Sequence, residues 1–212
     1  MKITNEDNME LMARYEDNYF DLAIVDPPYG INADIQQNKQ SESNRISNGG
    51  KWKKYHKTQW DNSVPTKQYF NELIRVSKNQ IIWGGNYFLD LHLKGCVIWY
   101  KGSNGNLKEG ELAKSSFNTF KVYKYSRADA YINHCDIKIH PTQKPVKLYE
   151  WLLMNYAKEG DKILDTHLGS GSIAIASHNL GYDLTACELD KVYYNAAMKR
   201  INQHKQQLRI AI

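Results

Sequence analysis

Short apolar runs recur along the chain and alternate with stretches in which apolar residues return every three or four positions. Runs of this kind, bounded by glycine, proline or charged residues, predict buried strands. They span residues 21–25, 80–83, 96–100, 162–165 and 184–187, and the aromatic-rich stretch 117–125 predicts a further strand. Strands that alternate with helices predict an α/β domain.

Start and stop signals locate the helices between these strands. Thr4-Asn5-Glu6-Asp7 reads as a capping box that opens a short first helix. Further helices are predicted from Pro65 and Thr66 onward, from Val146 to Lys158, from Ile173 to Gly181 and from Lys191 to about Leu208. The expected inward residues are Tyr69, Phe70, Leu73, Ile74 and Ser77 in the second helix, and Val192, Ala196 and Ile201 in the last.

The chain has 212 residues, enough for one α/β domain and too few for two. Its net charge of +5 is unevenly distributed. Residues 31–60 carry six basic and two acidic side chains, and residues 191–212 carry five basic and no acidic side chains. Segregated positive charge favours a polyanionic partner, although a solvated surface would explain the C-terminal excess equally well.

The three cysteines are Cys96, Cys135 and Cys187, which are widely spaced and lack metal-binding spacing. They predict a reduced, cytoplasmic protein that holds no metal ion. The sequence contains no signal peptide and no apolar run of membrane-spanning length, so a membrane location is not expected.

Asp26-Pro27-Pro28-Tyr29 follows the apolar run 22–25, at the carboxyl edge of the predicted sheet, where open α/β folds bind ligands. Proline has no N–H, so this loop offers two acceptors, the Asp26 carboxylate and the Pro27 carbonyl oxygen. Two acceptors suit the exocyclic amine of a nucleobase, and each charge-assisted hydrogen bond contributes about 1.5–3 kcal/mol. The ring of Tyr29 could stack on the base. Taken alone, a simple turn fits these four residues equally well.

A second unit reads as strand, glycine turn, helix and strand. Asp165 ends its first strand, Gly169-Ser170-Gly171-Ser172 form the turn, and Glu188 follows the second strand, 23 positions after Asp165. Glycines let the backbone approach a ligand closely, and an acidic residue near this spacing meets ribose hydroxyls in nucleotide-binding folds. Alone, the unit is typical of dinucleotide binding.

These units, with His140-Pro141-Thr142-Gln143-Lys144-Pro145 between them, resemble the DNA methyltransferases that methylate adenine N6 or cytosine N4. The order, with the Asp-Pro-Pro-Tyr signature first, is similar to the beta class of that family. The resemblance implies a circularly permuted, Rossmann-like fold with a mostly parallel sheet and helices on both faces. It also implies one domain over 1–212 and S-adenosylmethionine as cofactor. It is weakest over 31–60 and 101–139, and the second range could form a compact target-recognition region.

By this resemblance, the catalytic residues are Asp26, Pro27, Pro28 and Tyr29. The implied cofactor-binding residues are Asp7, Thr142, Lys144, Asp165, Thr166, Gly169, Ser170, Gly171, Ser172 and Glu188. Thr142 and Lys144 would hold the cofactor carboxylate, because they precede a helix start, which favours anions. A helix cap is an equal interpretation of Asp7. Asp165-Thr166-His167 departs from the Asp-Pro-Phe of many relatives, which bears on cofactor affinity.

The aspartate-led signature favours adenine N6 over cytosine N4 by resemblance. No cysteine follows a proline, so the Pro-Cys nucleophile of cytosine-C5 methyltransferases is missing and direct displacement on a flipped-out base is expected. DNA is the implied partner, while a homodimer and a restriction endonuclease partner stay open. Alternatives are N4-cytosine methylation, methylation of protein glutamine or RNA, a nicotinamide-dependent oxidoreductase, and a non-catalytic DNA-binding relative.

The stretch 31–60 has no apolar period and reads as a long loop. Its basic and aromatic side chains suit contacts with phosphates and exposed bases. The residues predicted to bind DNA are Lys51, Trp52, Lys53, Lys54 and Lys57. A surface insertion without DNA contacts is the competing interpretation.

Deleting residues 36–56 is expected to weaken DNA binding, because the deletion removes five basic side chains and only one acidic one. Fluorescence anisotropy with a labelled duplex at fixed salt measures the change. A folded deletion variant with unchanged affinity would show that this loop does not bind DNA.

Overall fold

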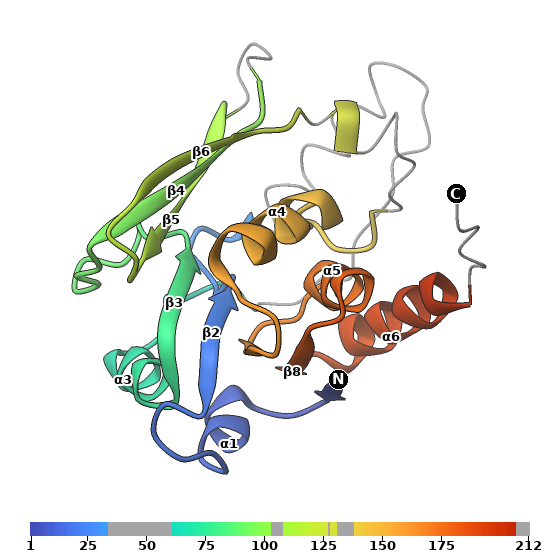
Figure 1. The fold of residues 1–212 in the computed structure, drawn as a ribbon, viewed down its shortest axis with the longest axis horizontal. Helices are drawn as coiled ribbons and strands as arrows, with labels where there is room; N and C mark the ends of the chain where they lie inside the picture. The colour runs from blue at the N-terminus through green and yellow to red at the C-terminus, as the bar shows by residue number, and fades with distance from the viewer. Residues whose placement is uncertain (34–60, 103–107, 127, 131–137, 207–212) are drawn as a thin grey trace.

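The computed structural model describes residues 1–33, 61–102, 108–126, 128–130 and 138–206. The DNA-binding residues predicted at 51–54 and 57 lie outside these ranges. Within them, eight strands form one sheet in the order β1-β8-β7-β2-β3-β5-β4-β6; most of these strands are labelled in Figure 1. The strands are β1 (Lys2–Thr4), β2 (Phe20–Val25), β3 (Ser77–Trp83), β4 (Gly95–Tyr100), β5 (Gly110–Ser115), β6 (Phe120–Lys124), β7 (Lys162–Asp165) and β8 (Asp183–Cys187).

The sheet is mostly parallel, as expected from the sequence. The strands β1, β8, β7, β2 and β3 run in one direction, and β5 is antiparallel to both β3 and β4. The strands β7 and β8 come from the C-terminal part of the chain, yet they lie between β1 and β2. This order joins the predicted cofactor unit to the strand that carries Asp26.

Helices cover both faces of the sheet (Figure 1). They are α1 (Asn8–Met12), α3 (Lys67–Val76), α4 (Val146–Tyr156), α5 (Ser172–Leu180) and α6 (Lys191–Lys205). Successive residues of a strand point to opposite faces. Leu22 and Ile24 therefore pack in the cluster formed with α4, α5 and α6, whereas Ala23 and Val25 pack in the cluster formed with α1 and α3. The expected α/β fold with helices on both faces is confirmed.

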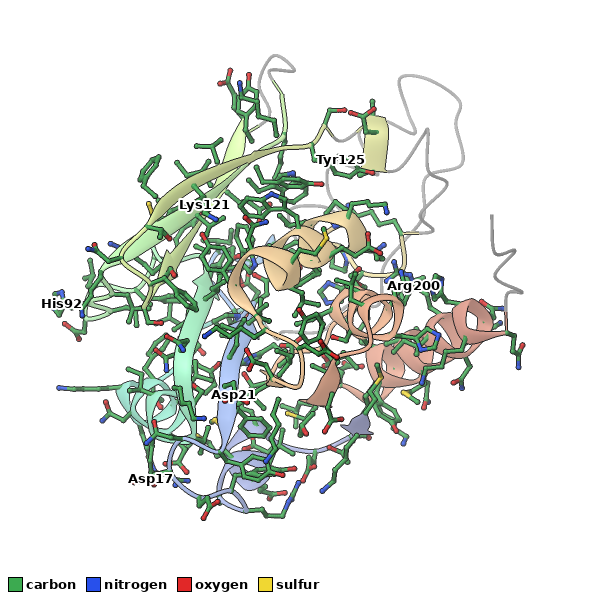
Figure 2. The ribbon with its side chains drawn as sticks, viewed as in Figure 1. Asp17, Asp21, His92, Lys121, Tyr125 and Arg200 are labelled. Carbon is green, nitrogen blue, oxygen red and sulfur yellow. The ribbon has the colours of Figure 1, made fainter. Side chains whose placement is uncertain are left out.

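A side-chain contact also ties the outer strands to a helix. Figure 2 shows Lys121 on β6, whose Nζ donates to Asn155 Oδ1 at 2.8 Å and lies 5.2 Å from the ring centroid of Tyr156 in α4. None of the helices in the described ranges is long and apolar enough to span a bilayer.

The predicted capping box at residues 4–7 is wrong. Thr4 ends the edge strand β1, which pairs in parallel with β8, and Asp7 alone caps α1 by accepting the Met9 N–H at 2.7 Å. The cap interpretation of Asp7 is therefore correct. Two strands were not predicted, because β1 has only three residues and β5 contains no apolar run.

The predicted inward faces of two helices also need correction. In α3, Ile74 is 45% exposed and Val76 is buried, while Ser77 already belongs to β3. In α6, Val192 is 49% exposed and Ala196 is only partly buried; the buried residues are Tyr193, Ala197 and Ile201. Tyr193 takes the inward position because its ring packs edge-to-face on His140, with centroids 4.3 Å apart. Tyr69 and Leu73 of α3 and Ile201 of α6 are buried as predicted, so periodicity gave each inward face only in part.

Gly171 lets α5 and α6 approach each other. Its φ is +74°, and a Cβ at this position would lie 2.9 Å from Ile201 Cδ1 and 3.4 Å from Ala197 Cβ. The sequence suggested that this glycine gives room for a ligand. The structure shows that the space it leaves is filled by α6.

Gly171→Ala is expected to lower the free energy of unfolding by about 1–2 kcal/mol through its left-handed backbone and by about 1–3 kcal/mol more through overpacking. Gly181→Ala is the matched control, because its φ is +79° and no atom lies within 4 Å of the added Cβ. Urea denaturation of both variants measures the difference. Equal losses would show that the α5–α6 contact does not require glycine.

Candidate active site

Two strands bring the two predicted halves of the site together. Leu22 of β2 pairs with Ile163 of β7, and Ala23 pairs with Leu164. Parallel neighbours end at the same edge of a sheet, where α/β folds bind ligands. Asp26 therefore follows β2 beside Asp165, which ends β7 and leads into the glycine turn.

A cavity of about 510 Å³ lies at this edge. Its volume falls in the usual range of about 300–1,000 Å³ for small-molecule sites. The predicted residues that line it are Asp26, Pro28, Thr142, Lys144, Thr166, Gly169, Ser170 and Glu188. Pro27, Tyr29, Asp165, Gly171 and Ser172 do not contribute to its walls, and Asp7 caps α1 while its neighbours Glu6 and Asn8 face the cavity.

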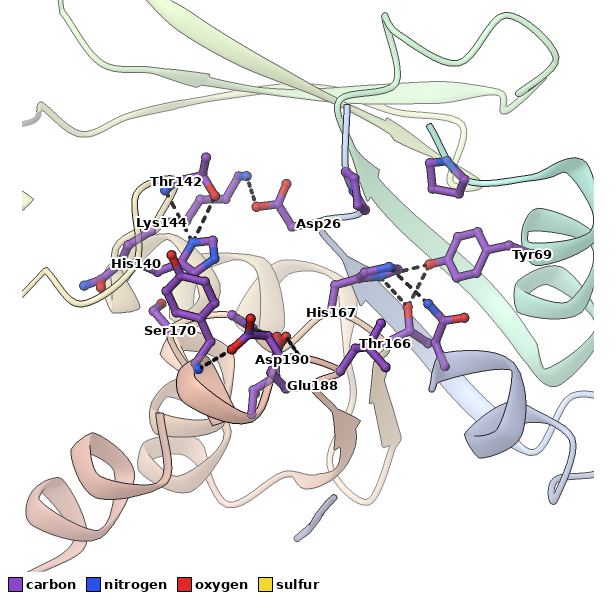
Figure 3. Close-up of a pocket in the computed structure, with 18 of the residues that line it drawn as sticks. Asp26, Tyr69, His140, Thr142, Lys144, Thr166, His167, Ser170, Glu188 and Asp190 are labelled. Carbon is purple, nitrogen blue, oxygen red and sulfur yellow. Dashed lines mark hydrogen bonds and ion pairs between the residues drawn. The ribbon is translucent and has the colours of Figure 1, made fainter. Parts of the chain in front are cut away.

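Both carboxylate oxygens of Asp26 have partners. The Tyr29 hydroxyl donates to Oδ1 at 2.5 Å, and the Lys144 ammonium forms an ion pair with Oδ2 (Figure 3). Burial raises the pKa of Asp26, and the charge of Lys144 opposes that rise. The ion pair thus favours the anionic form in a buried position.

Tyr29 is fixed by an aromatic wall. Its ring stacks on Tyr87 with centroids 5.0 Å apart and an interplanar angle of 13°. A Cβ on Gly84, where φ is +73°, would lie 2.2 Å from the Tyr29 ring, so glycine is required at this turn. Burial raises the pKa of Tyr29 well above its ordinary value, which keeps the hydroxyl a neutral donor.

Lys144 also reaches a second carboxylate. Its Nζ lies 3.2 Å from Glu111 Oε2, and Lys101 forms an ion pair with Oε1 of the same residue. Burial alone would raise the pKa of Glu111, but Lys144 and Lys101 outweigh it and lower the pKa to about 2. Sequence reasoning missed Glu111, because β5 has no strand pattern to place it.

Glu188 braces the glycine turn. Its Oε2 accepts the Gly169 N–H at 2.8 Å, and its Oε1 accepts the Asp190 N–H at 2.9 Å. Arg200 of α6, labelled in Figure 2, donates to the Ser170 carbonyl oxygen at 2.8 Å. A carboxylate has about four acceptor sites, so Glu188 can also accept hydroxyl groups from a bound ligand.

Polar side chains form one wall of the cavity around Thr166 and His167. Tyr69 Oη and Thr166 Oγ1 lie 2.7 Å apart, and Thr166 Oγ1 lies 3.0 Å from His167 Nδ1 (Figure 3). Asn8 Nδ2 lies 3.2 Å from His167 Nε2. Burial lowers the pKa of His167 to about 3, so its ring is neutral at ordinary pH.

His140 has a structural role in the site. Its Nδ1 accepts from the Thr142 hydroxyl at 3.1 Å, and its ring packs on Tyr193. Burial lowers the pKa of His140 to about 3, so the ring is neutral and acts as an acceptor. Nearby Asp165 accepts the His167 N–H at 3.0 Å, and burial raises its pKa to about 8.

Asp61 anchors the loop that follows Asp26, and sequence reasoning missed it. This buried carboxylate accepts N–H groups from Tyr29 at 2.6 Å, Gly30 at 2.9 Å and Ala33 at 2.9 Å. No local pattern around Asp61 indicates these contacts, because its partners lie about thirty residues earlier in the chain.

Comparison with known proteins gives a family match. The model of the family described as DNA methylase matches residues 37–199, which begin after the Asp26 loop. Type II methyltransferase M2.DpnII of Streptococcus pneumoniae is 23% identical over 253 aligned positions, covering 97% of this chain and 91% of that protein. Type II methyltransferase M.HpaI of Haemophilus parainfluenzae is 22% identical over 240 positions, covering 92% of this chain and 72% of that protein.

Solved structures share the fold. The M1.HpyAVI–SAM complex has a TM-score of 0.60 at 20% identity and covers 94% of this chain and 98% of its own. TTHA0409 of Thermus thermophilus, complexed with S-adenosyl-L-methionine, has a TM-score of 0.60 at 16% identity. The match covers 98% of this chain and 95% of that chain. The PvuII DNA methyltransferase, which is cytosine-N4-specific, has a TM-score of 0.57 at 12% identity. The match covers 95% of this chain and 90% of that chain.

Asp61→Ala is expected to lower the free energy of unfolding by about 2–4 kcal/mol, because three backbone N–H groups lose a charged acceptor. Asp61→Asn should lose less, since its remaining oxygen can still accept. Exposed Asp90 provides the control variant Asp90→Ala. Urea denaturation measures the stabilities, and an Asp61→Ala protein as stable as Asp90→Ala would refute the anchoring role.

Proposed function

The chain belongs to the DNA methylase family of N6- and N4-amino methyltransferases, and we propose that it methylates the N6 amine of adenine in DNA. The observation that carries this proposal is one cavity lined by the Asp26 loop, the Thr142–Lys144 segment, the glycine turn and Glu188. The Asp26 carboxylate, an acceptor for an amine, thus lines the same cavity as groups suited to a nucleoside cofactor.

The cavity fits S-adenosylmethionine in its volume and donor set. Glu188 can accept the ribose hydroxyls, the backbone at Gly169 and Ser170 can approach the ligand, and Thr142 also lines the cavity. When bound, the cofactor supplies an electrophilic methyl group on a sulfonium. Gly171, Ser172, Asp165 and Asp7 would support these walls from outside the cavity.

In the proposed reaction, Asp26 and the Pro27 carbonyl oxygen accept the two amine hydrogens and aim the nitrogen lone pair. The bound cofactor would supply the methyl group for the new N–C bond, and the electron pair of its broken S–C bond would stay on sulfur. The amine would pass its surplus proton to the Asp26 carboxylate that accepts its hydrogen bond. Pro28 stiffens the loop, and Tyr29 would stack on the flipped base after it leaves Tyr87.

Cytosine N4 is the second candidate, since it presents the same amine chemistry, and the PvuII enzyme with this fold is cytosine-N4-specific. The proposal takes residues 1–212 as one cytoplasmic methyltransferase domain that binds DNA. Residues 101–139, which include β5 and β6, would form its compact target-recognition region.

Incubation with labelled S-adenosylmethionine and mixed-sequence DNA, followed by nucleoside analysis, should yield N6-methyladenosine. Asp26→Ala is expected to lower the rate at least about 100-fold, because an electrostatic contact to the reacting amine is lost. Calorimetric titration should show cofactor binding retained in that variant, and Asp90→Ala is the control.

N4-methylcytidine as the product would favour the second candidate. A folded wild-type protein that binds DNA without methylating either base would identify a non-catalytic relative.

A further inference from the structure

The proposed function assigns one amine hydrogen to Asp26, and both oxygens of its carboxylate are already engaged. Tyr29 donates to Oδ1, and the Lys144 ammonium pairs with Oδ2. A substrate N–H would therefore compete with these donors for the carboxylate oxygens. Of the two donors, Lys144 also contacts the carboxylate of Glu111, so it is the one that can leave Asp26 and keep an ionic partner.

Lys144 has a second carboxylate within reach. Its side chain is 1% exposed, so an unpaired ammonium at this depth would be strongly destabilising. Glu111 Oε2 lies 3.2 Å from Nζ, and the Tyr29 hydroxyl lies at the same distance. The ammonium can thus move from Asp26 toward Glu111 without losing its ionic partner.

Charges alternate along this cluster. Asp26, Lys144, Glu111 and Lys101 carry negative, positive, negative and positive charge in spatial order, and each neighbouring pair is in contact. Lys101 holds Glu111 in place, and its Nζ also lies 4.5 Å from the ring centroid of Trp99. The formal charges of the cluster sum to zero. A shift of Lys144 toward Glu111 therefore weakens the electrostatic attraction between Lys144 and Asp26 without creating a net buried charge.

We propose that Lys144 is a movable counter-ion of Asp26 and that Glu111 is the positioning residue that receives it when a substrate amine binds. This inference rests on the proposed function. In the free protein Lys144 holds Asp26 as a carboxylate, and in the complex Glu111 draws the ammonium away so that Oδ2 can accept the amine. Glu111 thereby acts through Lys144 and does not touch the substrate.

This role differs from the one that resemblance gave to Lys144. A lysine that held the cofactor carboxylate would direct its ammonium toward the glycine turn or the start of α4. Here Nζ is directed toward β2 and β5, and it also lies 5.1 Å from the ring centroid of Trp83. Of the two residues that the resemblance assigned to the cofactor carboxylate, only Thr142 keeps that assignment.

Several titratable groups surround Asp26, and their charges determine in which direction its pKa moves when one of them is substituted. They are Tyr29 in its own loop, Lys144 before α4, Glu111 on β5 and Asp165 at the end of β7. The charge of Glu111 raises the pKa of Asp26, and the charge of Lys144 lowers it. The pKa of Asp165 is about 8, so its titration belongs to the alkaline side of a pH profile.

Glu111→Gln and Lys144→Met test the inference. Glu111→Gln keeps the shape of the side chain and removes its charge, so kcat should fall at least 10-fold while the KM for DNA stays within about twofold. The acid limb of the kcat profile should move to lower pH in Glu111→Gln and to higher pH in Lys144→Met. Exposed Glu109, which directly precedes β5, gives the matched control Glu109→Gln.

The outcomes separate this inference from the proposed function. If the wild-type protein is active and Glu111→Gln keeps the wild-type kcat, the inference alone is overturned. The same holds if Glu111→Gln lowers kcat but leaves the acid limb of the pH profile in place. A wild-type protein that methylates no DNA would overturn both. Glu111→Gln decides the question by itself if Lys144→Met does not fold, and thermal melting of each variant reports its folding.

Discussion

The pairing of β2 with β7 is the contact on which the site depends. Residues about 140 positions apart, Leu22 and Ile163, lie in parallel register, and their strands end at one edge. Because of this pairing, the Asp26 loop after β2 and the glycine turn after β7 line the same cavity. A circular permutation moves the cofactor unit along the sequence without changing this adjacency.

The buried charges at that edge impose a second constraint. A buried ion pair gives little net stability, because the cost of desolvating both ions is close to their mutual attraction. The cluster from Asp26 to Lys101 therefore indicates a function more than a structural need. Three other titratable groups of the site are neutral. The rings of His140 and His167 are deprotonated, and the hydroxyl of Tyr29 is protonated.

Sequence reasoning located the features that depend on local pattern. The apolar strands β2, β3, β4, β7 and β8 and the Asp26 loop were predicted, because each is encoded within a few residues. The strands β1 and β5 were not predicted, because β1 is short and β5 has no apolar run. The helix faces were harder to predict, since tertiary packing decides whether Ile74 or Val76 turns inward. Asp61 and Glu111 could not be found at all, because their importance comes from partners about 30 residues distant in the sequence.

The departure at Thr166-His167 shows how such contacts replace a local motif. A Pro-Phe pair would give this wall a rigid backbone and an apolar ring. Here the hydroxyls of Tyr69 and Thr166 and the amide of Asn8 engage both nitrogens of His167. Each of these polar groups thereby has at least one hydrogen-bond partner. The imidazole can then face the cavity as a fixed, neutral ring, which is the physical property that a phenylalanine would supply.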